Sequence, residues 1–240
     1  MKPIVIIILM LYSATNYSQV VKQDSLFYKD VYGIRLGFDI SNPIQTLFNN
    51  KRKSIELVAD YRLSKKYFLA AEIGFLDNTI NENYYDVQTK GQYIKLGANY
   101  NLYKNFLDME NEVYLGLRYG FSFFNHKVSK ITINSDIILP ENHLNNTLSF
   151  TDLNAHWGEL IIGMKVAVYE NVFLGVSAGF KRLITDKEPD NFKNIYMPGF
   201  NRVYLNNGGF TFNYTIMYRL PLYKKNKIDK IEDVKSIEKK

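Results

Sequence analysis

The last strand-like segment of the chain, residues 210–222, shows most clearly the pattern that dominates this sequence. Every second residue from Phe210 to Leu222 is apolar, and the residues between them are mostly polar, with Arg219 among them. A repeat of two residues is the period of a β-strand, whereas a helix would not keep these apolar side chains on one side. The segment is also about as long as a tilted strand needs to be to cross a bilayer. It is therefore predicted to be a membrane-spanning strand.

Seven earlier segments repeat this alternation. They cover residues 32–40, 54–63, 67–76, 93–102, 112–124, 155–168 and 172–182. The connections between successive segments are about 13, 3, 16, 9, 30, 3 and 27 residues long, so longer and shorter connections alternate. Outer-membrane barrels alternate in this way, with short periplasmic turns and longer outer loops. The sequence predicts an all-β fold, an eight-stranded antiparallel up-and-down transmembrane β-barrel with both chain ends in the periplasm.

The glycines indicate which face of each strand points to lipid, since a soluble lipocalin-like barrel would show the same alternation with its faces reversed. A narrow eight-stranded interior needs small residues beside long charged ones, whereas a solvent-exposed strand face gains nothing from glycine. Nine of the 14 glycines lie on the polar face: Gly33, Gly37, Gly74, Gly97, Gly116, Gly120, Gly163, Gly175 and Gly179. The polar face is therefore predicted to line the lumen.

On this interpretation seven cations and five anions point into the barrel. They are Arg35, Arg62, Lys95, Arg118, Lys165, Lys181 and Arg219, with Asp39, Glu56, Asp60, Glu72 and Glu159. Buried charges are costly unless they are paired and hydrogen-bonded. The sequence therefore predicts a ladder of ion pairs that fills the lumen, and a substantial pore is the least favoured function.

The ends of the chain differ from this pattern. Residues 1–18 have the form of a secretory signal peptide, with Lys2 before an apolar run from Ile4 to Tyr12. That run is too short to span a bilayer as a helix, so a retained anchor is less favoured. Residues 19–31 are expected to be a periplasmic lead-in, residues 32–223 the barrel, and residues 224–240 a charged periplasmic tail. A solvated tail is favoured over a short amphipathic helix.

Composition narrows the function classes further. The chain has no cysteine, which excludes disulfides, thiolate metal sites and a lipid-anchored N-terminal cysteine. The net charge of +6 comes mainly from the tail, which has seven lysines against four acidic residues, and from Lys2. The remainder carries only +2, so the charge does not predict a nucleic-acid-binding surface.

Few residues suggest catalysis. Neither a phosphate-binding glycine loop, a zinc-binding His-Glu-x-x-His motif nor a Gly-x-Ser-x-Gly elbow occurs. The three histidines, His126, His143 and His156, are expected at the surface. A lipid-modifying enzyme would need a catalytic group of this kind, and His156 with Ser149 or Asp152 is the only plausible candidate.

Other candidate residues have simpler structural explanations. Glu56 and Asp60 share one strand face and could form a catalytic carboxylate pair, but Arg62 follows on that face and paired charges are more often structural. Trp157, the only tryptophan, could stack on a ligand at the barrel rim, although a packing or interfacial role is favoured. Residues 206–209, Asn-Asn-Gly-Gly, could cradle an anion but are more simply a turn.

The connection at residues 185–207 mixes charged, aromatic and turn-forming residues. Loops of this length are usually functional or disordered. A binding loop and a self-packed lid over the barrel mouth are equally favoured for it.

Several short motifs resemble those of a known group of proteins. They are Asn16-Tyr17-Ser18-Gln19, Glu56-Leu57 with Asp60-Tyr61-Arg62, Trp157-Gly158-Glu159-Leu160, Asn171-Val172-Phe173-Leu174-Gly175 and Pro198-Gly199-Phe200-Asn201. With them the chain resembles uncharacterised outer-membrane barrel families of Bacteroidota over most of residues 20–223. The resemblance implies a fold and a location and assigns no catalytic residues. Barrels of this kind often end on an aromatic residue, whereas here Tyr223 is followed by a charged tail.

The sequence as a whole favours a non-enzymatic outer-membrane barrel with a structural, adhesive or surface-binding role carried by its long outer loops. We expect a monomer in contact with outer-membrane lipid, with no cofactor, metal site or catalytic residue. An outer-membrane enzyme acting on lipid is one alternative. The other is a soluble periplasmic barrel that binds a hydrophobic ligand, and its cavity would be lined by Leu36, Leu96, Leu117 and Ile162.

Overall fold

The computed structural model describes residues 29–81, 86–105, 109–129, 131–133, 142–144, 147–189 and 193–226. The expected signal peptide, residues 1–18, lies outside these ranges, as do residues 19–28 and residues 227–240 of the expected tail. In the part of the chain that is described, no helix has the length and apolarity required to span a membrane.

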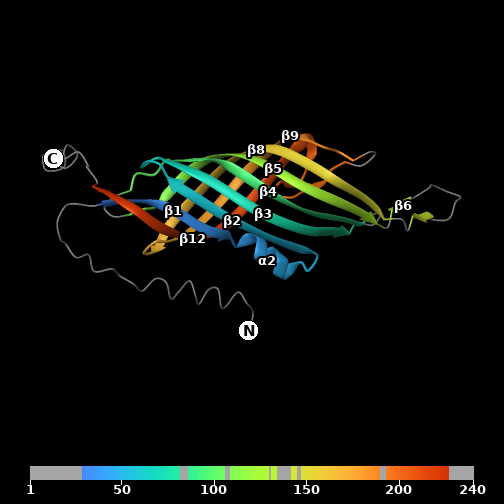
Figure 1. Ribbon diagram of the computed structural model, residues 1–240, viewed down its shortest axis with the longest axis horizontal. Coiled ribbons are helices and arrows are strands. Elements are labelled where there is room, and N and C mark those ends of the chain that lie inside the picture. Colours follow the sequence, from blue (N-terminus) through green and yellow to red (C-terminus); the bar gives the residue numbers. More distant parts are fainter. Residues whose placement is uncertain are drawn as a thin grey trace. The chain divides into compact units, whose positions relative to one another are not determined.

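Eight antiparallel strands form a closed barrel, in which β1 pairs with β12 to close the ring (Figure 1). The strands are β1 (Lys29–Asp39), β2 (Arg52–Arg62), β3 (Tyr67–Asn81), β4 (Asp86–Asn101), β5 (Glu112–Ser129), β8 (Leu148–Tyr169), β9 (Val172–Asp186) and β12 (Gly208–Asn226). Their order around the ring is β1-β12-β9-β8-β5-β4-β3-β2. The predicted eight-stranded up-and-down barrel is therefore confirmed.

We name the two ends of the barrel by their connections. The turn end holds the first residue of β1, the last of β12 and the short β2–β3 and β8–β9 turns. The loop end holds the helix α2 (Ser41–Phe48), the small hairpins β6 (Ile131–Ile133) with β7 (Asn142–Leu144) and β10 (Tyr196–Met197) with β11 (Asn201–Arg202), and the 3-10 turn η2 (Leu205–Asn207).

Several strands are longer than the apolar alternation predicted. β3 continues to Asn81 and β4 begins at Asp86, so their connection is residues 82–85 and the predicted 16-residue loop is wrong. The strands extend because polar side chains pair across them: the side-chain amide of Gln88 donates to Asp77 at 2.8 Å. The regular alternation of long and short connections therefore fails at this point.

The helix α2 was not predicted either. Asp39, the last residue of β1, accepts hydrogen bonds from the backbone N and the Oγ of Ser41, each at 2.8 Å. Pro43 lies in the first turn of the helix, where its missing N–H costs no intrahelical hydrogen bond. The Asp39 carboxylate, which satisfies the first N–H of the helix, and the position of Pro43 thus allow a helix to start. The residue types in this stretch are also common in turns, so the sequence pattern did not indicate a helix.

A band of exposed apolar side chains surrounds the barrel. On β12 the band runs from Phe210 to Leu222. On β5 it ends at Phe123, after which the outward residues Asn125 and Lys127 are polar and exposed. The residues that a soluble barrel would place inside are 48–66% exposed: Leu36, Leu96, Leu117 and Ile162. The apolar face is therefore outside, as predicted, and β5 continues beyond the band.

Inward glycines make room for aromatic rings on the neighbouring strand. Gly120 lies opposite Trp157 in the β5–β8 register, and a Cβ at Gly120 would lie 2.1 Å from the indole Cε2. Gly74 stands in the same relation to Tyr93, and Gly163 to Tyr114. The sequence predicts that small inward residues accommodate charged side chains, but at these three positions they accommodate aromatic ones.

This packing leads to a first prediction. Gly120→Ala should lower the free energy of unfolding by about 1–3 kcal/mol, because Trp157 is fully buried and cannot move away from the added methyl group. Gly158→Ala is the matched control, because a Cβ at Gly158 meets nothing within 4 Å. Urea unfolding of both variants, followed by gel mobility without boiling, measures the difference. Equal midpoints for the two variants would contradict the prediction.

Candidate functional site

Near the turn end, an ion-pair cluster centred on Arg35 crosses the lumen. The Arg35 guanidinium donates through Nε to Asp60 at 2.6 Å and through Nη1 and Nη2 to Glu112 at 2.6 and 3.1 Å. Lys165 donates to the other oxygen of Asp60. Because β1 and β5 lie four places apart in the ring of eight strands, the Arg35–Glu112 pair spans the barrel.

A second cluster lies between β2, β3, β4 and β5. The ammonium group of Lys95 is 3.0 Å from Glu56 and 2.5 Å from Glu72, and Arg118 donates to Glu72 at 3.0 Å. The hydroxyl of Tyr93 donates to Glu56. All five side chains are largely buried, so their charges are compensated by one another instead of by bulk water.

The carboxylates considered for catalysis are therefore held apart. Glu56 belongs to the Lys95 cluster and Asp60 to the Arg35 cluster, and the two carboxylates share no hydrogen-bond or ion-pair partner among the described residues. Three acidic partners were missed by the sequence pattern: Asp30, Glu110 and Glu112. The last of these could have been found, because Glu112 lies two residues before Tyr114 and therefore shares the inward face of β5.

Three of the expected lumen charges, Asp39, Glu159 and Lys181, lack an ion-pair partner among the described residues, and Asp39 instead accepts hydrogen bonds at the start of α2. Lys181 donates to the backbone oxygen of Gly199 at 2.7 Å. Glu159 lies opposite Lys181 in the β8–β9 register, yet neither of its carboxylate oxygens accepts a hydrogen bond within the described part of the chain. The expected ladder of ion pairs is thus interrupted toward the loop end, where a segment of the chain enters the barrel.

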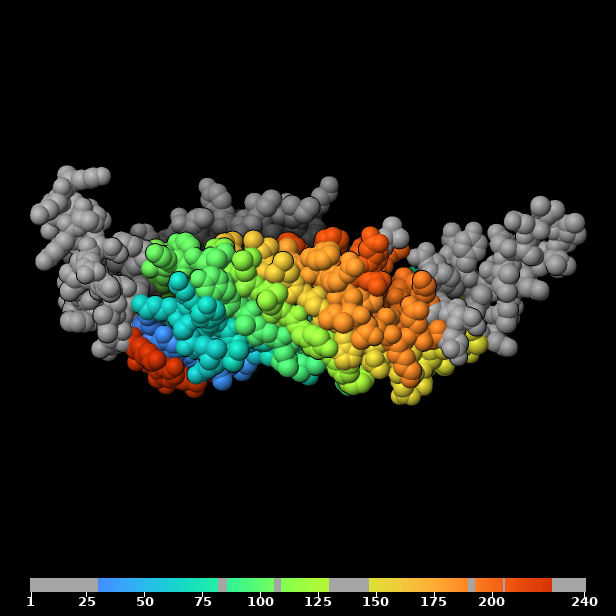
Figure 2. Space-filling view, turned by 90° about the horizontal axis from the view of Figure 1, so that it is seen from above, coloured from blue at the N-terminus to red at the C-terminus, as the bar shows by residue number. Residues whose placement is uncertain are grey.

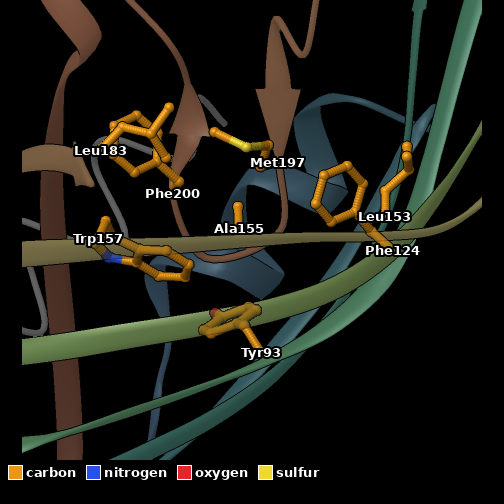
Figure 3. Close-up of a cluster of buried hydrophobic side chains, with 8 residues drawn as sticks. All are labelled: Tyr93, Phe124, Leu153, Ala155, Trp157, Leu183, Met197 and Phe200. Atoms are coloured by element: carbon orange, nitrogen blue, oxygen red, sulfur yellow. The ribbon is translucent and has the colours of Figure 1, made fainter. Parts of the chain in front are cut away.

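That segment is the centre of the connection at residues 187–207. Met197 and Phe200 are fully buried and pack on Trp157 and Tyr93 from the barrel wall (Figure 3). The whole cluster is Tyr93, Phe124, Leu153, Ala155, Trp157, Leu183, Met197 and Phe200. Gly199 has a φ of 76°, and a Cβ there would lie 2.6 Å from the Tyr93 ring, so the tip of the segment requires glycine. We call residues 196–200 the plug, and Trp157 is a packing residue beneath it.

Polar contacts fasten the plug at its edges. His126 is buried, donates through Nε2 to the amide oxygen of Asn194 at 3.1 Å, and has its Nδ1 2.9 Å from the hydroxyl of Thr89. The expectation that His126 lies at the surface is therefore wrong, because β5 extends past it. On the other side, Arg52 donates to the hydroxyl of Tyr196. Burial raises the pKa of Tyr196, while the nearby Arg52 charge opposes this shift.

The residues proposed for lipid chemistry do not form a cluster. His156 faces outward and its Nδ1 lies 2.8 Å from the hydroxyl of Tyr119. Ser149 is seven residues away along β8, about 23 Å at the rise of a strand, and Asp152 about 13 Å. His143 lies in β7, where only the backbone is described. In the described ranges no group of three potential metal ligands occurs.

The segment at residues 206–209 forms a turn into β12. Asn206 and Asn207 have positive φ values of 65° and 57°, which asparagine tolerates better than most residues. The backbone N of Tyr204 donates to the oxygen of Gly208 at 2.9 Å and closes the turn.

A polar cavity of about 170 Å³ lies between the plug, α2 and β12. Its lining includes Arg52, Lys181 and Asp39, with Asn42 and Gln45 from α2. Both cations also contact the plug, through Tyr196 and Gly199. This cavity offers polar groups from α2, the barrel wall and the plug to a small ligand.

Comparisons with known proteins identify the family of this chain. Among solved structures the chain is similar to Ail, the attachment invasion locus protein of Yersinia pestis, with 11% identity, a TM-score of 0.41, and coverage of 80% of this chain and 99% of that chain. Comparison with curated proteins finds no match. A family model described as a domain of unknown function, DUF6048, matches residues 1–225. The chain therefore belongs to the DUF6048 family.

Proposed function

We propose that this protein is a closed outer-membrane barrel that acts at the cell surface through its loop end, with a structural or surface-binding role and no catalytic activity. The band of exposed apolar side chains supports the membrane location, because such a surface is stable in lipid and not in water. The turn end then faces the periplasm and the loop end faces outward. A monomer, and the Bacteroidota origin that the resemblance implies, remain predictions.

One observation carries the surface role. β5 continues for six residues beyond Phe123, the last apolar residue of its outward face, which is about 20 Å of strand. The neighbouring β4 carries the exposed Lys90 at the same level, opposite Asn125. A rigid sheet with a polar outer face therefore projects beyond the membrane band, and it offers a surface that an outside partner can reach.

The closed lumen carries the second part of the proposal. The Arg35–Glu112 pair spans the barrel, and the plug fills the loop end above it. We expect planar-bilayer recordings of the purified protein to show no steady, large conductance. Recordings that show such a conductance would contradict a closed barrel.

The surface role is tested by charge reversal on the projecting sheet. Lys90→Glu with Lys127→Glu should change the retention of cells on a test surface, measured relative to a strain without the protein. Lys66→Glu makes the same change on an exposed residue at the turn end and should have no effect. Equal retention by the double variant, by Lys66→Glu and by the strain with the original protein would remove the support for binding through this face.

A further inference from the structure

The barrel wall is incomplete at the loop end of β1. That strand stops at Asp39, and it pairs with β2 only over Ile34–Phe38. Beyond this point the only strand partner of residues 209–213 of β12 in the described chain is β9, and residues 52–56 of β2 pair only with β3. Two strand edges therefore face a gap with no strand between them. On the opposite side of the ring, by contrast, β4, β5, β8 and β9 form a continuous packed surface (Figure 2).

The helix α2 covers this gap. It contacts both β2 and β12, and Figure 1 shows it along the side of the barrel, well short of the far ends of β3 and β4. Asp39 fastens the start of the helix to β12, because it also accepts a hydrogen bond from the backbone N of Tyr214 at 3.2 Å. The helix is thus part of the wall and not of the loops that project beyond it.

The outer face of α2 is apolar and lies within the membrane band. Leu47 and Phe48 are 80% and 86% exposed, Ile44 is also exposed, and the helix has no charged residue. The strand edge beside the gap carries Phe210 and Phe212, which are exposed members of the band. The outer face of α2 therefore meets hydrocarbon, and an acyl chain can lie against it.

Behind α2 lies the polar cavity, and its cations have unused hydrogen-bond donors. Arg52 Nε is buried and has no partner among the described residues. The ammonium group of Lys181 has three donors, of which one is directed to Gly199. Both acids in the lining of the cavity are already engaged. Asp39 accepts hydrogen bonds from the start of α2 and from β12, and Glu56 accepts one from Tyr93 and pairs with Lys95. The cavity therefore offers positive donors to a ligand and suits an anion.

We propose that the gap binds an anionic amphiphile from the surrounding membrane. Its phosphate or carboxylate headgroup occupies the cavity between Arg52 and Lys181. Its hydrocarbon chain leaves between α2 and β12, where the exposed Phe210 and Phe212 line the cavity, and lies against Leu47 and Phe48. Guanidinium and ammonium groups bind such anions through charge-assisted hydrogen bonds. The cavity of about 170 Å³ is more than ten times the ~10–15 Å³ that one water requires. This inference rests on the proposed membrane location and is independent of the surface role.

Trp157 provides the measurement. It is the only tryptophan of the chain and packs with Phe200, next to Gly199 in the lining of the cavity. The probe is an alkyl phosphate with a nitroxide label near its headgroup, added to the full chain in zwitterionic detergent. We expect saturable quenching of Trp157 fluorescence, with an affinity reduced about tenfold or more by Arg52→Gln or by Lys181→Gln. Lys53→Gln is the matched control, because Lys53 is the exposed neighbour of Arg52 on β2.

Phe48→Ser tests the acyl half of the site at a side chain that is 86% exposed, so the substitution removes little packing within the protein. This variant should lower the affinity for the labelled alkyl phosphate and leave the affinity for the competing inorganic phosphate unchanged. The proposal is overturned if an alkyl alcohol with the same label quenches Trp157 to the same degree. It is also overturned if Lys53→Gln lowers the affinity for the probe as much as Arg52→Gln does. A third contradicting result is displacement of the probe by inorganic phosphate as effective as displacement by unlabelled alkyl phosphate. Gel mobility without boiling shows separately whether each protein is a folded barrel, so a failure of binding is distinct from a failure of the membrane fold.

Discussion

Replacing Arg35 by methionine should lower the free energy of unfolding by about 3–5 kcal/mol, the largest effect we expect for a charged residue. The loss comes from the partners, because Glu112 would remain buried without a cation and Asp60 would keep only Lys165. The guanidinium also lies between the rings of Phe68 and Phe173, at 4.8 and 4.9 Å from their centres. Urea unfolding followed by Trp157 fluorescence measures the change.

Two further variants separate charge burial from general damage. Arg35→Met with Glu112→Met should be more stable than Arg35→Met alone, because the unpaired carboxylate is removed with its partner. Lys90→Met is the surface control: its ion pair with Asp77 is long, at 3.8 Å, and exposed, so its loss should cost less than about 1 kcal/mol. A double variant no more stable than Arg35→Met would show that the Arg35 cluster does not act as a buried ion pair.

Phe200→Ala should release the plug from the barrel mouth. Phe200 is fully buried, and its ring meets Trp157 edge to face with 5.9 Å between ring centres. Truncating a buried phenylalanine costs about 3–5 kcal/mol. Because the plug is a local segment held mainly by this packing, we expect the cost to appear as local opening. Trp157 emission should shift to longer wavelength, and trypsin should cleave the folded barrel at Arg202.

The control for this variant is a phenylalanine on the outer face of β12. Phe210 is exposed on the lipid-facing side of β12, so Phe210→Ala should leave the Trp157 emission and the trypsin resistance unchanged. If Phe200→Ala keeps the emission and the trypsin resistance of the original protein, the plug is not held by packing on Trp157.

The barrel itself was predictable because a membrane-spanning strand must alternate between apolar side chains that face lipid and polar side chains that face the lumen. This alternation is visible directly in the sequence. The pattern fails where this constraint ends. Beyond the membrane band, Asp77 and Gln88 bond each other across β3 and β4, and such polar pairs leave no apolar period in the sequence. Strand existence was therefore predicted better than strand length.

The contents of the lumen were predicted in kind but not in detail. The alternation of inward and outward side chains identified Arg35 and Asp60 as inward charges. Continuing this alternation along β5 past Phe124 would also have placed His126 inside. The alternation does not show which cation meets which anion across the lumen, since that depends on strand stagger. The plug and α2 could not be predicted, because Pro198 and Gly199 suit an outer loop as well as an inserted one, and α2 fills a gap that exists only in the folded wall.

The central claim is that the apolar face of this barrel meets lipid. The most direct test fractionates native cells and compares the gel migration of the membrane-extracted protein with and without boiling. We predict recovery in the outer membrane and faster migration of the unboiled sample, as expected of a compact barrel. Recovery as a soluble protein without detergent would contradict the account, because the exposed side chains of Leu36, Leu96 and Leu117 would then have to be covered by something other than lipid.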